Sequence, residues 1–224
     1  MFHNLKQSRL ALGGDKRVAE GQFWDSIYRN INSRQVQYDL WLEPFLAELA
    51  QSKDTPVIDL GCGAGNDTLY LTERGFSVIA CDLSPEALKR VKEIAPAADT
   101  RLVDLLDPLP FASGSAHAVI ADLSLHYFGW VDTERIASEI RRVLNPSGML
   151  LCRVNSTKDV EYGAGRGTLL EPNYYEWDGK RKRFFDRPAL ELLFRDWDIM
   201  LVNEQTMNRY DKPKVVWTLA ARNK

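Results

Sequence analysis

Short apolar runs alternate with segments of helical periodicity along most of this chain. Each run is nearly continuous in apolar residues and too short to form a helix, which predicts a strand buried on both faces. The strands predicted in this way cover residues 56–60, 77–81, 101–103, 118–121 and 149–154.

The segments between these strands carry helix signals. A helix through Leu69 and Leu71 is expected to end at Gly75. Ser84 followed by Pro85 indicates an N-cap with proline at the first helical position. Apolar residues between positions 134 and 144 have the spacing of one helix face, which predicts a further helix there.

This alternation of strands and helices predicts an α/β fold, a parallel sheet covered on both faces by helices. Near the end of the chain, the apolar runs 198–202 and 214–220 are separated by a loop with no room for a crossover helix. Two strands joined so closely are expected to pair antiparallel. Right-handed crossovers then place ligand sites at the carboxyl ends of the parallel strands.

The whole chain, residues 1–224, is expected to form a single domain with its core at 55–154. Residues 155–185 are polar, aromatic and glycine-bearing without a clear period, which predicts an irregular lid over the substrate. Residues 1–33 are expected to form a partly helical arm, and residues 186–224 a helix and the hairpin.

One further segment, residues 35–50, has the apolar spacing of an amphipathic helix. The composition limits the function classes, because 45% of the residues are hydrophobic and the formal net charge is only −2. A near-neutral chain gives no global electrostatic reason to bind nucleic acid or an acidic membrane. No stretch approaches the ~20 apolar residues that span a bilayer, and no secretory signal is evident.

The three cysteines, Cys62, Cys81 and Cys152, have no paired spacing. An odd and scattered set argues against a disulfide framework and against a zinc site. We therefore expect a cytoplasmic protein that has no metal and no membrane contact.

The first predicted strand runs into a glycine-rich turn, DLGCGAG at residues 59–65. Glycine accepts positive φ and lets the backbone lie directly against a ligand. Any strand-to-helix turn can use glycine, but three glycines at alternate positions favour a ligand-binding turn. The spacing differs from the Gly-x-Gly-x-x-Gly of dinucleotide binding, and Asp59 stands two residues before the first glycine.

Two more acids follow the next strands along the chain. Asp82 comes after the second strand, where a carboxylate can accept hydrogen bonds from both ribose hydroxyls of a nucleoside. Asp104 comes after the third strand, where it can accept from an adenine amino group while Leu105 packs on the ring. Together with the glycine turn, these acids predict one nucleoside-shaped pocket.

These motifs resemble those of the class I S-adenosylmethionine-dependent methyltransferases. The resemblance covers about residues 55–154, and it implies a Rossmann-like, seven-stranded sheet with which the C-terminal hairpin agrees. It also implies that S-adenosylmethionine is the cofactor and S-adenosylhomocysteine the product. A looser resemblance, in residues 66–71, is to the tellurite-resistance and thiopurine methyltransferases, which act on small molecules.

The resemblance implies contacts with the methionine part at the glycine turn, with ribose at the second strand and with adenine at the third. Aromatic faces attract the sulfonium cation by about 0.5–2 kcal/mol, so aromatic residues of the N-terminal arm are also expected to contact the cofactor. The expected cofactor-binding residues are Asp59, Gly61, Cys62, Gly63, Gly65, Asp82, Leu83, Asp104, Leu105, Trp24 and Tyr28.

Methyl transfer from a sulfonium requires alignment of donor and acceptor and, for some acceptors, a base. His126 is the most attractive candidate, because it follows the fourth strand and imidazole titrates near neutrality. Asp122 and Tyr127 are the alternatives.

The one basic run, residues 180–183, is compatible with a solvated turn, an anionic substrate or RNA phosphates. Enzymes that methylate nucleobase amines often carry an Asn/Asp/Ser-Pro-Pro-Tyr/Phe turn after strand four, and residues 122–125 differ from it. We therefore expect a small-molecule acceptor and consider nucleic acid a less suitable partner. A methyltransferase acting on RNA or protein through residues 180–183 and a non-catalytic S-adenosylmethionine-binding module remain alternatives.

Overall fold

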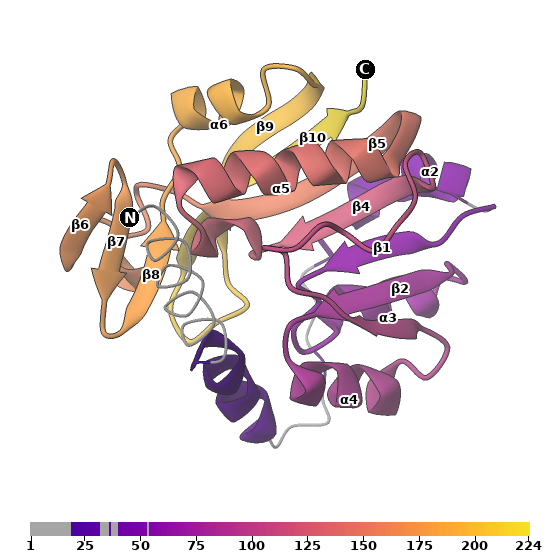
Figure 1. The fold of residues 1–224 in the computed structure, drawn as a ribbon, viewed down its shortest axis with the longest axis horizontal. Helices are drawn as coiled ribbons and strands as arrows, with labels where there is room; N and C mark the ends of the chain where they lie inside the picture. The colour runs from indigo at the N-terminus through magenta and orange to yellow at the C-terminus, as the bar shows by residue number, and fades with distance from the viewer. Residues whose placement is uncertain (1–18, 32–35, 37–39, 53) are drawn as a thin grey trace, which may run out of the picture.

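The computed structural model describes residues 19–31, 36, 40–52 and 54–224. These residues form two β-sheets and the helices that surround them (Figure 1). The strands of the larger sheet are β1 (Val57–Leu60), β2 (Val78–Asp82), β3 (Asp99–Leu102), β4 (Ala116–Asp122), β5 (Leu144–Asn155), β9 (Asp198–Met207) and β10 (Lys214–Arg222).

The larger sheet has seven strands in the order β3-β2-β1-β4-β5-β10-β9. The first five strands in this order pair parallel, whereas β10 pairs antiparallel with both β5 and β9. The predicted mostly parallel sheet with an antiparallel C-terminal hairpin is therefore confirmed. The strand order reverses between β1 and β4, so the carboxyl ends of these two strands flank a crevice suited to a ligand.

Helices cover both faces of this sheet (Figure 1). They are α2 (Leu46–Leu49), α3 (Asn66–Thr72), α4 (Pro85–Ile94), α5 (Trp130–Val143) and α6 (Arg187–Leu193), with 3-10 turns at Glu43–Phe45, Ala50–Ser52, Leu125–Tyr127 and Val160–Tyr162. A further helix over residues 19–29, indigo in Figure 1, lies between β8 (Lys180–Arg183) and α4. Within the described ranges, no helix combines the length and apolar character that a membrane crossing needs.

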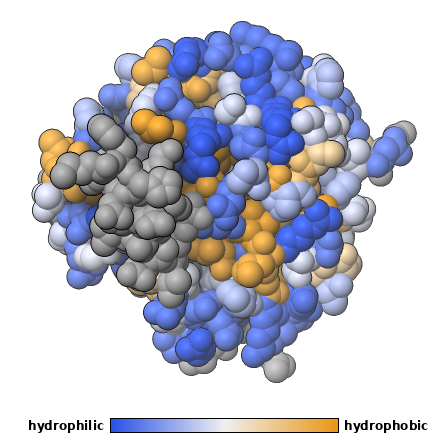
Figure 2. Space-filling view, viewed as in Figure 1, coloured by the Kyte–Doolittle hydropathy of each residue, from blue (hydrophilic) through white to orange (hydrophobic). Residues whose placement is uncertain are grey.

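The core follows from the alternation of side chains along the strands. Ile58 and Leu60 of β1 pack with Ile136 of α5 on one face of the sheet. The side chain of Val57, which precedes Ile58, points to the other face and belongs to the cluster that holds Leu71 of α3. On the face shown in Figure 2, hydrophobic residues gather near the middle and hydrophilic ones surround them.

The expectation that residues 155–185 are irregular is wrong, because they contain the strands β6 (Thr168–Glu171), β7 (Tyr174–Trp177) and β8. These strands form a separate antiparallel sheet. Their side chains are largely exposed or half-buried, so no apolar period marks them. A local signal existed in Asp178-Gly179, which both have positive φ and form the two-residue turn between β7 and β8.

Two helix predictions also need correction. Of the single helix expected over residues 35–50, the described part holds short helical turns from Glu43 to Ser52, and residues 35 and 37–39 lie outside the description. Leu40 has φ of 55°, which a continuous α-helix does not allow. Helix α5 begins at Trp130, earlier than the predicted residue 134. In the predicted arm, residues 1–18 and 32–33 lie outside the described residues.

Candidate active site

A cavity of about 1020 Å³ lies at the carboxyl ends of the parallel strands. It is walled by the ends of β1, β2 and β4, the helix 19–29, the β7–β8 turn and the loop between β9 and β10. The predicted site residues that line it are Trp24, Tyr28, Asp59, Gly61, Cys62, Gly63, Asp82, Leu83, Asp104, Leu105, Asp122, His126 and Tyr127. The structure therefore brings together residues that are far apart in the sequence.

Gly65 is the predicted site residue that does not line this cavity. A Cβ there would lie 2.9 Å from Cγ2 of Val91, so this glycine allows α3 to pack closely on α4. At Gly61, in contrast, a Cβ would lie 2.5 Å from Cβ of Ser124, and φ is +71°. Gly61 thus lets the turn lie close to Ser124, just after the end of β4.

Asp82 connects the glycine turn to the start of α4. Its carboxylate accepts hydrogen bonds from the backbone N–H groups of Gly63 and Ser84, both at 2.9 Å. The side chain is buried, and this burial raises the pKa of the carboxyl group. As predicted, Ser84 caps α4 and accepts from the Ala87 N–H at 3.2 Å.

The helix 19–29 covers the glycine turn. The Ser84 hydroxyl donates a hydrogen bond to Asp25 of this helix, and Arg29 lies 3.7 Å from Glu86 of α4. The Tyr28 hydroxyl lies 2.7 Å from the position that a Cβ of Gly63 would occupy. The predicted aromatic arm therefore closes the cavity on the side of the turn.

Asp104 and Leu105 border the cavity beyond β3. The Asp104 carboxylate accepts a hydrogen bond from the Leu106 N–H at 2.8 Å, which fixes its orientation. An oriented carboxylate beside an apolar side chain suits a flat ring with an amino group.

Asp59 is buried at the end of β1, and Thr68 of α3 donates a hydrogen bond to its carboxylate at 2.6 Å. Burial raises the pKa of Asp59 to about 7, with Asp122 and Asp82 adding to the increase. This carboxyl group therefore loses its proton near neutral pH.

The raised pKa of Asp59 predicts how binding of a cationic ligand depends on pH. The carboxylate attracts a sulfonium and the neutral acid does not, so affinity rises as pH rises through 7. Between pH 6 and pH 8 we expect about a tenfold gain in S-adenosylmethionine affinity, measured by calorimetry. The Asp59→Asn variant should show a flat profile, and a rise of the same size in that variant would contradict the assignment.

Asp122, at the end of β4, is bound by two arginines that sequence reasoning did not identify. The Arg153 guanidinium donates to it at 2.7 and 2.8 Å, and Arg209 lies 2.9 Å away. These charges hold the pKa of Asp122 well below its usual range, although burial opposes them. A carboxylate bound in this way is a poor proton acceptor.

His126 and Tyr127 form the opposite end of the cavity. His126 is buried, and its Nδ1 has no hydrogen-bond partner among the described residues. Burial lowers the pKa of His126 well below its usual value, and the charges of Lys214 and Lys182 lower it further. The imidazole is therefore neutral. Burial raises the pKa of the Tyr127 hydroxyl, which keeps its proton.

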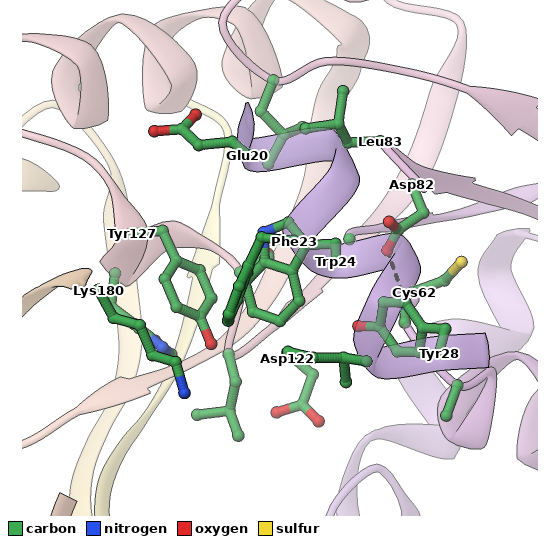
Figure 3. A pocket seen from close by; sticks show the side chains of 18 of the residues that line it. Glu20, Phe23, Trp24, Tyr28, Cys62, Asp82, Leu83, Asp122, Tyr127 and Lys180 are labelled. Carbon is green, nitrogen blue, oxygen red and sulfur yellow. Dashed lines mark hydrogen bonds between the residues drawn. The ribbon is translucent and has the colours of Figure 1, made fainter. Parts of the chain in front are cut away.

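Aromatic rings divide the cavity into two halves. Trp24 contacts the Tyr127 ring edge-on, with 4.9 Å between centroids, and stacks on Tyr28 at 6.1 Å. In Figure 3, Asp82 and Tyr28 lie to one side of Trp24, and Tyr127 lies to the other. The half with Asp82 and Tyr28 thus carries the acids suited to a nucleoside, and the half with Tyr127 carries the His126 imidazole.

Residues 180–183 do not form a single basic patch. Arg181 pairs with Glu176 at 2.6 Å, and the buried Arg183 pairs with Glu171. Lys180 is exposed, while Lys182 is half-buried and lines the cavity. The four charges thus have separate environments.

The family model of a methyltransferase domain matches residues 58–152. These residues hold the glycine turn, the acids of β1 to β4 and His126. Residues 58–152 thus match a methyltransferase domain, and this match covers less than half of the chain.

Curated relatives share this methyltransferase domain. An uncharacterized methyltransferase of Synechocystis is 38% identical over 104 residues, which cover 46% of this chain and 49% of that protein. The tRNA 5-carboxymethoxyuridine methyltransferase of Escherichia coli is 32% identical over 144 residues, which cover 59% of this chain and 52% of that protein. The chain thus spans about half the length of these relatives.

Solved structures share the fold. A methyltransferase of Methanosarcina mazei matches with a TM-score of 0.69 and 17% identity, over 84% of this chain and 99% of that one. The 1,6-didemethyltoxoflavin-N1-methyltransferase of Burkholderia thailandensis matches with a TM-score of 0.64 and 19% identity, over 97% of this chain and 90% of that one. The methyltransferase fold therefore extends beyond the matched domain to most of the described chain.

Proposed function

We propose that this protein transfers the methyl group of S-adenosylmethionine to a small-molecule acceptor and releases S-adenosylhomocysteine. One observation carries the proposal. A single cavity holds Asp59, Asp82 and Asp104 at one end and a buried imidazole with an unpartnered nitrogen, His126, at the other.

The residues present fit this cofactor. Asp82 is oriented by two N–H groups and has lone pairs left for ribose hydroxyls. A side chain on Gly61 or Gly63 would fill the cradle beside the turn. When bound, S-adenosylmethionine supplies a sulfonium methyl group to the acceptor nucleophile, and the electron pair of the broken C–S bond stays on sulfur. If the acceptor atom carries a proton, a base must remove it.

His126 is the base that we favour. Its neutral imidazole has a free nitrogen, whereas Asp122 is occupied by two arginines and Tyr127 keeps its proton. Trp24 contacts the Tyr127 ring edge-on, and their aromatic faces can attract the sulfonium cation. In this proposal, Asp122 and Tyr127 orient neighbouring side chains and do not accept the proton.

The His126→Ala variant is expected to bind S-adenosylhomocysteine as the wild type does but to transfer methyl groups about 100-fold more slowly, the usual size of a general-base effect. Calorimetry and label incorporation separate the two quantities. His117→Ala is the matched control, because His117 lies near the start of β4 and does not line the cavity. Equal rates in the two variants would remove His126 from the mechanism.

A small acceptor is supported by the separate environments of residues 180–183, since Arg181 and Arg183 have carboxylate partners. The Burkholderia neighbour is named for 1,6-didemethyltoxoflavin and was crystallised with that compound. An RNA acceptor is the second candidate, because the Escherichia coli relative is named for a tRNA nucleoside.

Incubation with methyl-labelled S-adenosylmethionine tests the proposal, with a metabolite pool and bulk tRNA as separate acceptor sources. Label in a small product supports it. Label in tRNA, with binding that falls steeply with salt, selects the second candidate. Donor binding without transfer to either source indicates a non-catalytic module.

A further inference from the structure

The half of the cavity that holds Tyr127 and His126, the acceptor half, is lined by two lysines that have no acidic partner among the described residues, the exposed Lys180 and the half-buried Lys182. Arg209 is neutralised by Asp122 at 2.9 Å, and Lys214 by Asp159 at 3.0 Å. Lys182 also lines the cavity, and its ammonium group has neither an ion pair nor a hydrogen bond with any residue that the structure describes.

Asp159, the acid whose charge acts on Lys182, is engaged by Lys214, and the glutamates of the small sheet are engaged by arginines. Glu176, on the neighbouring strand β7, accepts from Arg181 at 2.6 Å, and Glu171 of β6 is paired with Arg183. The local charges therefore leave a positive excess at Lys182. A half-buried ammonium without a partner loses hydration and gains nothing in return, which favours binding of an anion.

The position of Lys182 is well defined. It lies in β8 and pairs with Tyr175 of β7 in the antiparallel register. Burial and the charges of Lys214 and Lys180 lower the pKa of Lys182 to about 8, so it is still mostly protonated at neutral pH. The ammonium is thus a fixed positive charge in a site crowded with like charges.

Two further groups complete the subsite. His126, Lys182 and Lys214 all line this cavity, and the charges of the two lysines lower the pKa of the imidazole. His126 Nδ1 is buried without a partner and donates a hydrogen bond in one tautomer. Lys214 is held by Asp159 and lies 4.2 Å from the centroid of the Tyr162 ring.

We propose that the methyl acceptor carries an anionic group, a carboxylate or a phosphate, that binds Lys182 in the part of the cavity that His126 and Lys214 also line. This inference rests on the proposed function and names its substrate class. Binding at this end would hold the rest of the acceptor beside Tyr127 and Trp24, facing the half that holds Asp82.

The test titrates inorganic phosphate, and separately acetate, into protein saturated with S-adenosylhomocysteine, with calorimetric detection. Because a hydrogen-bonded charge contributes about 1.5–3 kcal/mol, Lys182→Gln should weaken binding of the preferred anion about tenfold or more. Lys89→Gln, an equal charge change on the exposed side of α4, should leave it unchanged. The stronger of the two anions identifies the group.

Equal anion affinity in wild type and Lys182→Gln, or no binding of either anion to the wild type, overturns the inference. Failure of the wild type to bind S-adenosylhomocysteine would instead overturn the proposed function. A short RNA whose affinity falls equally in Lys180→Gln and Lys182→Gln, without binding of free phosphate, would replace the anionic small molecule by RNA.

Discussion

The Asp122→Asn variant is expected to lose about 3–5 kcal/mol of unfolding free energy, the usual cost of breaking a buried ion pair. The carboxylate lies between Arg153, whose side chain is 0% exposed, and Arg209, at 12%. Asparagine keeps the shape and one acceptor oxygen but removes the negative charge that pairs with both guanidinium groups. Urea denaturation followed by circular dichroism measures the loss.

An exposed pair provides the control for this experiment. Asp132 and Arg135 are 3.1 Å apart, but both side chains are more than 40% exposed, so Asp132→Asn should cost less than about 1 kcal/mol. The double variant Asp122→Asn/Arg153→Met should recover part of the loss, because it also removes one of the two buried guanidinium charges. Equal stability of Asp122→Asn and wild type would show that water reaches this cluster.

The parallel core was predictable because its signals are local. Continuous apolar runs mark β1, β2 and β4, and Ser84-Pro85 marks the start of α4. The acids of the candidate site follow those strands directly, so the order of the strands brings them to one edge of the sheet.

The acceptor half was less predictable, because its residues meet only in the folded chain. Arg209 comes from the β9–β10 loop and reaches Asp122 through the pairing of β10 with β5. An arginine within an apolar strand, Arg153, was a signal of a buried ion pair. The basic run 180–183 suggested one patch, yet burial increases along β8 from Lys180 to Arg183, and glutamates pair with the two arginines.

The largest effect on ligand binding is expected for Asp82→Ala. If the carboxylate accepts both ribose hydroxyls, two charge-assisted hydrogen bonds of about 1.5–3 kcal/mol each are lost, and affinity for S-adenosylhomocysteine falls at least about 100-fold. The glycine turn also loses its anchor, because the Gly63 N–H donates to this carboxylate at 2.9 Å. Calorimetric titration of the variant gives the affinity.

Two further variants separate ribose binding from support of the turn. Asp82→Asn retains an oxygen that can accept from the Gly63 N–H but lacks the charge, so its affinity should lie between those of wild type and Asp82→Ala. Asp99→Ala removes an exposed acid at the start of β3, outside the cavity lining, and should bind as the wild type does. Unchanged affinity in Asp82→Ala, with the fold intact by circular dichroism, would mean that the nucleoside does not bind at the end of β2.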